Sequence, residues 1–243
     1  MSVIVDPWGH VRSLTPARIA LGRSGGSLPT PQVLAFSLAH ARARDAVHRP
    51  LDLPAMQAAV PEAVVVRSAA ADRATYLRRP DLGRRLADPA PLAGIGADVA
   101  VVLADGLSPA AVEQTGVEVL HALGPALAAA GLSLAPVIAL QARVALGDAV
   151  AAAIGAHAVV VLIGERPGLS VPASLGAYVT WAPVPGISTD AQRNCVSNIQ
   201  PDGLSAAEGA RRVAWLLAAA RALGQSGVAL KDDSATAALP APG

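Results

Sequence analysis

Residues 98–108 read DVAVVLADGLS, and this stretch decides the fold class. An apolar run of buried-strand length ends at Asp105-Gly-Leu-Ser108, a turn that also suits the first residues of a helix. The pattern recurs along the chain, with strands expected at 98–104, 132–140 and 158–163 and helices at 109–130 and 147–154. Strands joined by helices in this way indicate right-handed crossovers. We therefore expect an α/β fold with a Rossmann-like parallel sheet wrapped by helices.

The rest of the chain is assigned around this sheet. Residues 176–182 predict one more strand, and residues 205–223 predict a closing helix. Thr15-Pro16 and Thr30-Pro31 are typical helix starts, whereas prolines cut the segment from residue 51 to 86 into short pieces. We expect three parts: a helical N-terminal arm or cap over residues 1–90, the sheet domain over 91–231, and a disordered tail over 232–243.

Composition excludes several classes of protein. Hydrophobic residues make up 53% of the 243 residues but aromatic residues only 2%, so the chain lacks the rings on which nucleic-acid bases stack. Residues 119–142 carry no charge, yet Pro125, Gly131 and Pro136 divide them, which favours a buried helix and strand over a membrane span. The single cysteine cannot form an intrachain disulfide, and the first residues do not resemble a secretory signal. We expect a cytoplasmic protein that binds neither nucleic acid nor membrane.

Charge is distributed unevenly along the chain. Residues 1–85 hold 12 Arg against 6 acidic residues, a net charge of +6, and residues 86–243 hold 7 basic against 12 acidic residues, a net charge of −5. The basic part is suited to docking on an acidic partner. From the residues alone, scattered arginines on a solvated helical surface are the commoner explanation of such a pattern.

Three segments are expected to meet at one edge of the sheet. In open parallel sheets, ligands bind beyond the carboxyl ends of the strands, where 105–108, 141–144 and 164–169 should lie. In the third segment, Glu165 and Arg166 stand between Gly164 and Gly168, which would let the backbone approach a bulky ligand. The alternative is that Glu165 and Arg166 cap a helix or pair in solvent.

A second cluster of polar residues surrounds the lone cysteine. In residues 190–199, Asn194, Ser197 and Asn198 flank Cys195 and supply neutral donors and acceptors. A nucleophilic cysteine needs an activating histidine, and none lies in this segment, so a buried structural thiol is the commoner outcome. The chain also has no dinucleotide fingerprint, Walker loop, serine-hydrolase elbow or zinc spacing. The residues alone indicate a ligand-binding α/β domain, with no metal site.

Six blocks of sequence resemble one family, the small subunit (light chain) of ethanolamine ammonia-lyase. Together they span about residues 8 to 231 in order, and six ordered blocks are far more specific than one. The blocks are RSLTPARIALGR at 12–23, AHARARDAVH at 39–48, YLRRPDLGRR at 76–85, ADGLS at 104–108, GERPG at 164–168 and RNCVSNI at 193–199.

The resemblance implies a two-subunit radical enzyme that converts ethanolamine to acetaldehyde and ammonia. Its cofactor is adenosylcobalamin, whose cobalt–carbon bond breaks homolytically, and a larger barrel-type subunit carries most of the substrate site. The small subunit covers the cofactor from its nucleotide side, so we assign it no catalytic residue. Carried over position by position, its cofactor contacts fall on Val144, Glu165 and Cys195.

Two further expectations and two alternative readings follow. No stretch fits the Asp-x-His-x-x-Gly pattern that donates a histidine to cobalt, so the cofactor should stay base-on, with its own benzimidazole as lower ligand. Some relatives carry a longer N-terminal extension associated with packaging in a bacterial microcompartment. This chain starts near the first block, which argues against packaging by that route but leaves an association with a microcompartment open. The alternative reading is a stand-alone carrier of a cobamide or a nucleotide, and a basic assembly scaffold is a third.

Overall fold

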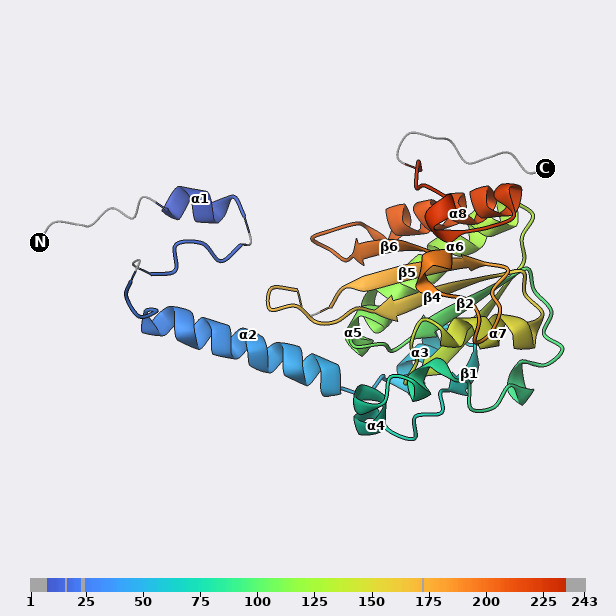
Figure 1. Cartoon of the computed structure of the whole chain (residues 1–243), viewed down its shortest axis with the longest axis horizontal. Coiled ribbons are helices and arrows are strands. Elements are labelled where there is room, and N and C mark those ends of the chain that lie inside the picture. Colours follow the sequence, from blue (N-terminus) through green and yellow to red (C-terminus); the bar gives the residue numbers. More distant parts are fainter. Residues whose placement is uncertain (1–7, 16, 23–24, 172, 235–243) are drawn as a thin grey trace, which may run out of the picture.

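The computed structural model of the protein describes residues 8–15, 17–22, 25–171 and 173–234. Its centre is a six-stranded sheet with the strand order β1-β3-β2-β4-β5-β6 (Figure 1). The strands are β1 (Val64–Arg67), β2 (Val99–Ala104), β3 (Leu134–Leu140), β4 (Ala158–Gly164), β5 (Leu175–Trp181) and β6 (Arg193–Ile199).

Helices cover the two faces of the sheet unequally. The helices are α1 (Gly9–Ser13), α2 (Thr30–His48), α3 (Leu53–Ala59), α4 (Arg73–Arg78), α5 (Pro109–Ala111), which a π-turn (Val112–Gly116) joins to α6 (Val117–Ala129), α7 (Leu146–Ile154) and α8 (Ala206–Leu223). Short 3-10 turns lie at Leu82–Arg84, Ala90–Leu92, Asp190–Gln192 and Gly227–Ala229. On one face α6 packs on α8, and α8 covers β5 and β6; on the other face α7 packs on β2 and β4. The α7 face of β5 and β6 is therefore left without a covering helix.

The central α/β pattern predicted from the sequence is confirmed. Strands β1, β3, β2 and β4 run parallel, and β2 and β4 are buried at every residue. Residues 119–142, which carry no charge, form most of α6 and β3, as expected. Each face of the sheet has its own apolar cluster, and both are filled by Ala, Val, Leu and Ile with few aromatic side chains. The α/β class thus follows from the buried strands.

The expectation of a wholly parallel Rossmann-like sheet was wrong at β5. This strand pairs antiparallel with both β4 and β6, so the sheet is mixed. The physical reason is the connection from Gly164 to Leu175, whose described residues form no helix. A parallel crossover needs a dozen or more residues, usually including a helix, whereas a short connection folds back as a hairpin. The start of β5 therefore lies at the edge where β4 ends.

Two strands were not predicted from the sequence. β1 lies in the proline-cut segment and pairs with β3 at the edge of the sheet, with α3 and α4 on either side of it in the chain. β6 falls in residues 190–199, which were described as a cluster of polar residues around Cys195 and were assigned no strand. It is short of apolar residues because only one of its faces is covered, by α8.

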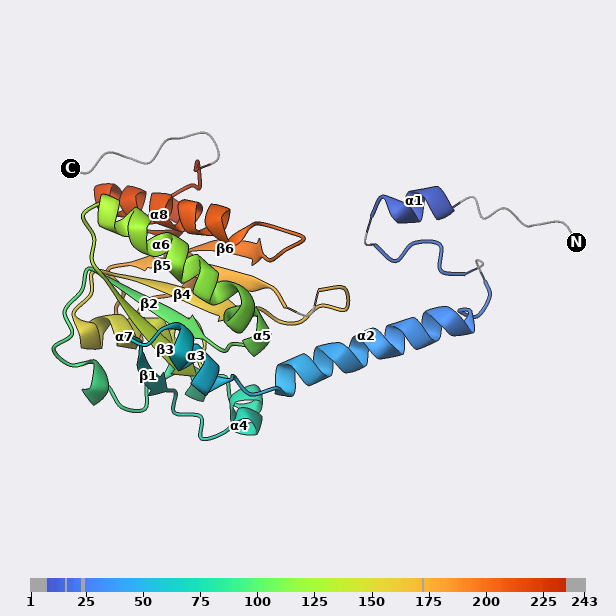
Figure 2. The same cartoon turned by 180° about the vertical axis from the view of Figure 1, so that it is seen from behind.

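The arm formed by α1 and α2 projects away from the sheet, as both views of the chain show (Figures 1 and 2). Helix α2 has 19 residues, none of them buried, and its side chains Leu34 and Phe36 are 64% and 50% exposed. Within the described residues no helix is both long and apolar enough to cross a membrane. Most of the tail predicted to be disordered, residues 235–243, lies outside the described part of the chain.

Candidate functional site

The three predicted loops meet at the carboxyl edge of β2, β3 and β4. The backbone N–H of Leu107 donates to the carbonyl oxygen of Gly164 at 2.8 Å, which joins the loops after β2 and β4. The carboxylate of Asp105 accepts the backbone N–H groups of Gln141 at 2.9 Å and Ala142 at 3.0 Å, which joins the loops after β2 and β3. Buried Asp105 thus connects the loops that follow β2 and β3.

Glu165 and Cys195 come together around a residue that the sequence analysis did not single out, Tyr178. The Tyr178 hydroxyl on β5 donates to Oε1 of Glu165 at 2.9 Å, and Tyr178 lies directly opposite Cys195 in the β5–β6 register. Cross-strand partners project from the same face, so the thiol and the phenol stand side by side. We call Glu165, Tyr178 and Cys195 the β5–β6 cluster. Glu165 therefore pairs with a tyrosine, and neither caps a helix nor pairs with Arg166.

In the β5–β6 cluster, the thiol is accessible, and both the thiol and the phenol are neutral. Cys195 is exposed, yet the protein packed around its sulfur raises the pKa of the thiol, an effect that the Tyr178 hydrogen bond partly offsets. Burial, reinforced by Cys195 and Glu165, raises the pKa of Tyr178. Both groups remain protonated at neutral pH. Cys195 is then a poor nucleophile, and the buried thiol expected from composition is instead a surface group.

Val144 lies on the same side of the sheet as the β5–β6 cluster. It follows β3 and precedes α7, and it packs against the same apolar cluster as Tyr178. Tyr178 and Thr180 alternate with Ala177 and Val179, whose side chains enter the opposite core beneath α8. The three predicted contact residues thus border the helix-free part of the α7 face.

A network of arginine and tyrosine side chains fixes the loop that carries Val144. The Tyr76 hydroxyl donates to the carbonyl oxygen of Ala142 at 3.0 Å, and the guanidinium of Arg143 lies 4.4 Å from the centre of the Tyr76 ring. Arg73 belongs to the same network. It pairs with the carboxylate of Asp105 at 3.0 Å and donates to the backbone carbonyl oxygen of Val47 at 2.8 Å. The end of α2 and helix α4 are therefore tied to the site loops.

Glycines in the site make room for protein atoms. A methyl group at Gly176 would overlap Oε1 of Glu165, so this glycine is what lets the Glu165 carboxylate lie beside Tyr178. A methyl group at Gly164 would overlap the backbone of Ser108. Gly164 was expected to let the backbone approach a ligand; its small size instead lets two loops pack together.

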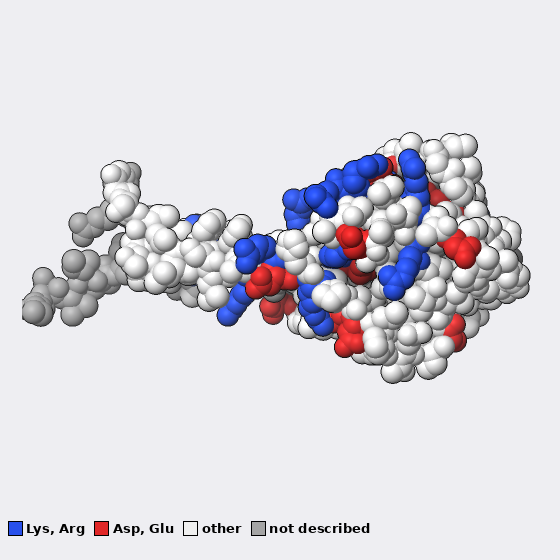
Figure 3. All heavy atoms as spheres, turned by 90° about the horizontal axis from the view of Figure 1, so that it is seen from below, with Lys and Arg blue, Asp and Glu red and all other residues white. Residues whose placement is uncertain are grey.

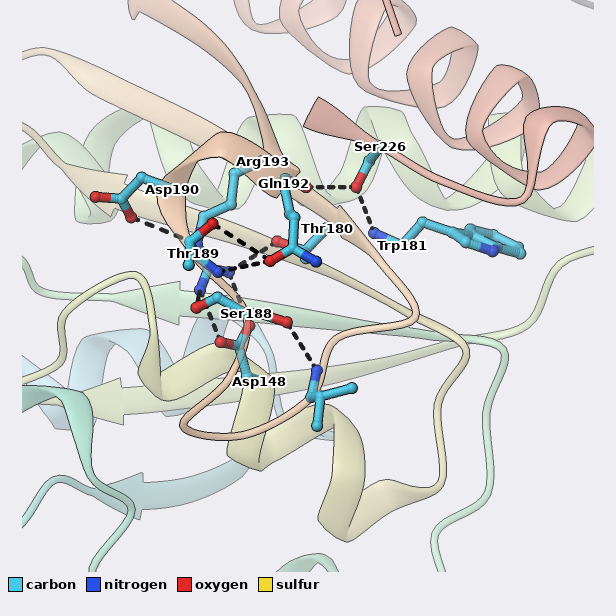
Figure 4. Close-up of polar contacts among 10 residues, drawn as sticks. Asp148, Thr180, Trp181, Ser188, Thr189, Asp190, Gln192, Arg193 and Ser226 are labelled. Carbon is cyan, nitrogen blue, oxygen red and sulfur yellow. Dashed lines mark hydrogen bonds and ion pairs between the residues drawn. The ribbon is translucent and has the colours of Figure 1, made fainter. Parts of the chain in front are cut away.

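The second expected cluster divides between the two faces of β6. Asn194 donates to the carbonyl oxygens of Gly227 at 3.2 Å and Leu230 at 2.8 Å, so it fastens the chain after α8 rather than flanking the thiol. Arg193 was not predicted to matter, and it forms a buried two-pronged pair with Asp148 of α7, at 2.7 Å for each contact (Figure 4). The side chains of Arg193 and Asp148 are 2% and 1% exposed. Arg193 and Cys195 lie two residues apart on β6 and therefore project from the same face of the sheet.

The described residues contain no group of three or more His, Cys, Asp or Glu side chains that could hold a metal ion. The β5–β6 cluster offers one carboxylate, one neutral thiol and one neutral phenol, and no described histidine is hydrogen-bonded to any of them. This arrangement suits binding of a polar ligand rather than acid–base or nucleophilic catalysis.

The fold and site define a class: a mixed-sheet α/β protein with an open, polar surface on one face of its sheet and a projecting arm whose helix α2 has no buried residue. The family model described as ethanolamine ammonia-lyase light chain (EutC) matches residues 5–231. The chain is 54% identical to the ethanolamine ammonia-lyase small subunit of Rhodopseudomonas palustris, with 96% of this chain and 95% of the relative covered. It is 49% identical to that of Azotobacter vinelandii, with 98% and 93% covered. The chain belongs to the ethanolamine ammonia-lyase small-subunit family.

Proposed function

We propose that this chain holds base-on adenosylcobalamin against a larger catalytic subunit, and that the complex converts ethanolamine to acetaldehyde and ammonia. The observation that carries the proposal is the β5–β6 cluster, whose Cys195 is exposed on the part of the sheet that no helix covers, while Val144 packs against the same apolar cluster as Tyr178. These positions are the ones that the family resemblance assigned to cofactor contacts.

The residues at this surface fit a corrinoid. A corrin ring is a broad apolar disc with neutral amide side chains, and it needs compact apolar contacts and hydrogen-bond acceptors. Oε1 of Glu165 is occupied by Tyr178, while no described residue donates to Oε2, which is therefore available for an amide N–H. In the neighbouring loop, Oε1 of Gln141 and Nε of Arg143 are buried without a hydrogen-bond partner among the described residues. Unpaired buried polar atoms of this kind are typical of ligand sites.

Each side chain has a passive role. Glu165 accepts hydrogen bonds from the amides of the ligand, and Tyr178 holds the Glu165 carboxylate in place. Val144 and Cys195 offer compact contact, and the thiol stays protonated, so it does not compete as a ligand for cobalt. When bound, the cofactor supplies radical chemistry by homolysis of its cobalt–carbon bond. The small subunit limits access of water to it and fixes its position.

The arm supports the need for a partner. Apolar side chains on α2 remain exposed, among them Val33, Leu34, Phe36 and Leu38. A helix that buries nothing within its own chain gains little from tertiary packing, so a surface of this kind marks an interaction site. Arg and Lys side chains gather where the end of α2 meets the sheet domain, whereas the far end of that face carries few (Figure 3). We infer that α2 and this basic region dock on the large subunit.

Co-expression with a large subunit tests the proposal. Ammonia release from ethanolamine should require both chains and adenosylcobalamin together. A stand-alone carrier would instead bind the corrinoid with full affinity when purified alone, and that result would overturn the subunit reading.

A site variant sharpens this test. Glu165→Ala removes a charged acceptor, which is worth about 1.5–3 kcal/mol, and should raise the Kd of the complex for adenosylcobalamin by about 10- to 100-fold. The matched control is Glu118→Ala, because Glu118 is exposed on α6 on the opposite side of the sheet. Binding is measured by equilibrium dialysis of the assembled complex, with cobalt as the readout. Equal Kd values for the two variants would remove Glu165 from the site.

A further inference from the structure

The loop that carries Val144 begins with a backbone conformation that needs support from outside the loop. Gln141, the first residue after β3, has a φ of 53°, in the left-handed region that residues with a side chain rarely adopt. A conformation of this kind persists only where surrounding contacts hold it. The position of Val144, which follows in the same loop, therefore depends on the groups that hold Gln141 in place.

Asp105, directly after β2, supplies two of these contacts. Its Oδ2 atom accepts the backbone N–H of Gln141 at 2.9 Å, and its Oδ1 atom accepts the backbone N–H of Ala142 at 3.0 Å. The side chain of Asp105 is only 4% exposed, so water is poorly placed to replace it as the acceptor. Asp105 therefore fixes the direction in which the chain leaves β3.

The same carboxylate is bound by Arg73, which also contacts the arm. Nη1 of Arg73 lies 3.0 Å from Oδ2 of Asp105, and Nε donates to the carbonyl oxygen of Val47 at 2.8 Å. Val47 lies in the last turn of α2, where carbonyl oxygens have no partner within the helix. Helix α4, which begins at Arg73, lies beside this end of α2 in both views (Figures 1 and 2). One rigid, planar guanidinium thus connects the arm to the residue that holds the turn.

The end of α2 is held on the sheet domain by polar contacts rather than by a packed core. Helix α2 has no buried residue. In the segment that follows it, Glu113 accepts from Arg49 at 2.6 Å and from the backbone N–H of Asp52 at 2.8 Å. An element with few buried apolar contacts changes its position at a low cost in free energy. A partner that binds the arm can therefore shift the end of α2, and the guanidinium of Arg73 moves with it.

We propose that Arg73 and Asp105 are positioning residues that set the turn at Gln141 according to where the end of α2 lies. Binding of a partner to the arm and binding of the corrinoid beside Val144 then favour each other through this connection. The inference rests on the proposed function, because it takes the ligand at Val144 to be the corrinoid and the partner of the arm to be the large subunit. Neither Arg73 nor Asp105 needs to touch the ligand.

Arg73→Lys tests the connection in the complex with the large subunit. A lysine at this position keeps a positive charge beside Asp105, but its single ammonium group cannot also replace the fork that reaches Val47. The Kd for adenosylcobalamin should rise about tenfold, whereas kcat for ammonia release at saturating adenosylcobalamin should stay within about twofold. The matched control is Arg79→Lys, because Arg79 follows α4, is exposed and binds only Asp81 among the described residues, at 2.9 and 2.8 Å. This control should change neither quantity.

The second measurement is the effect of the corrinoid on assembly. For the wild-type chain, adenosylcobalamin should lower the Kd between the two subunits by at least about tenfold, because two ligands that favour one arrangement strengthen each other's binding. In Arg73→Lys this factor should fall by at least about fivefold, while the Kd between the subunits without the corrinoid stays within about twofold. A purely structural role would weaken assembly with and without the corrinoid alike and would leave the factor unchanged.

Asp105→Asn removes the charge that Arg73 binds and one of the two acceptors for the turn. It should raise the Kd for adenosylcobalamin at least as far as Arg73→Lys does. Should this variant fail to fold, Arg73→Lys decides the question alone, because it leaves Asp105 and its contacts with Gln141 and Ala142 in place.

Three outcomes for Arg73→Lys overturn the inference: a Kd for adenosylcobalamin equal to that of Arg79→Lys, a lower kcat at saturating adenosylcobalamin, or an unchanged effect of the corrinoid on assembly. A folded Asp105→Asn variant with normal affinity also overturns it. The proposed function fails by a different result, namely that the wild-type complex does not bind adenosylcobalamin. The two failures are therefore distinguishable.

Discussion

At the scale of single residues, the site depends on which face of a strand each side chain occupies. Glu165, Cys195 and Val144 were predicted from the sequence through the family resemblance, and the structure brings Glu165 and Cys195 to one tyrosine. Tyr178 itself was not predicted, because its importance arises from the antiparallel pairing of β5 with β6, and a lone tyrosine in an apolar strand reads as ordinary core. Asn194 was misjudged for the same reason, since pairing turns it toward the far face.

The chain has two tyrosines, and they should respond oppositely to loss of the hydroxyl. Tyr178→Phe frees the Glu165 carboxylate and should raise the Kd for adenosylcobalamin by about tenfold, with little change in the free energy of unfolding. Tyr76→Phe leaves the buried carbonyl of Ala142 unpaired and should destabilise the fold by about 1–2 kcal/mol. Cobalt dialysis and urea unfolding measure the two effects. A destabilised Tyr178→Phe variant with normal affinity would contradict the positioning role.

Cys195 provides a pH-dependent probe, because it is the only cysteine in the chain. Its thiol pKa is raised, and the thiolate is the species that reacts, so alkylation by iodoacetamide should be slow at pH 7. The rate should rise about tenfold for each pH unit up to pH 9 without a plateau. Mass spectrometry of this chain gives the rate, and adenosylcobalamin should slow labelling in the assembled complex. A plateau below pH 8 would show a lowered pKa instead.

At the scale of elements, one ion pair joins parts of the chain that were predicted separately. Arg193 at the start of β6 reaches Asp148 on α7, and so connects the late strand to the central crossover (Figure 4). The buried strands β2, β3 and β4 could be predicted because their apolar runs are self-evident. β1 has only three valines, and β6 is polar on its open side, so neither carries a pattern that a single sequence reveals.

Removing one partner of this pair should cost far more than removing an exposed neighbour. Asp148→Ala leaves the Arg193 charge buried and unpaired, and should lower the free energy of unfolding by about 3–5 kcal/mol. Asp190→Ala is the matched control, because Asp190 also faces Arg193 but is fully exposed, and it should change stability by less than about 0.5 kcal/mol. Thermal and urea unfolding compare the two. Similar losses would mean that the buried pair is not the source of stability.

At the scale of the whole molecule, the arm and the sheet domain differ in how many of their residues are buried. The sheet domain has two apolar cores, whereas α2 buries none of its residues. Helix α2 begins at Thr30, as the Thr30-Pro31 start predicted, whereas the start predicted at Thr15-Pro16 was wrong, because the described residues 17–22 form no helix and α1 (Gly9–Ser13) ends before Thr15. The position of the arm could not be predicted, because it depends on contacts between segments far apart in the sequence, among them the bonds to the carbonyl oxygens of Val47 and Leu169 and the packing of α2 near α5.

A charge placed on the arm should affect assembly alone. Phe36→Glu puts a carboxylate in the centre of the exposed apolar surface, and should weaken association with the large subunit at least tenfold while unfolding of the sheet domain stays unchanged. Leu223→Glu, at an exposed apolar position at the end of α8, is the control. Co-purification and analytical gel filtration give the result. Normal assembly of Phe36→Glu would show that the partner docks elsewhere.

The uncovered flank of α2 also bears on how the protein has to be produced. A polypeptide that displays Leu34 and Phe36 to the surroundings tends to self-associate when it accumulates without its counterpart. Synthesis of this chain and of its partner therefore needs to be matched in amount and timing. A surplus of this chain should form aggregates or be degraded.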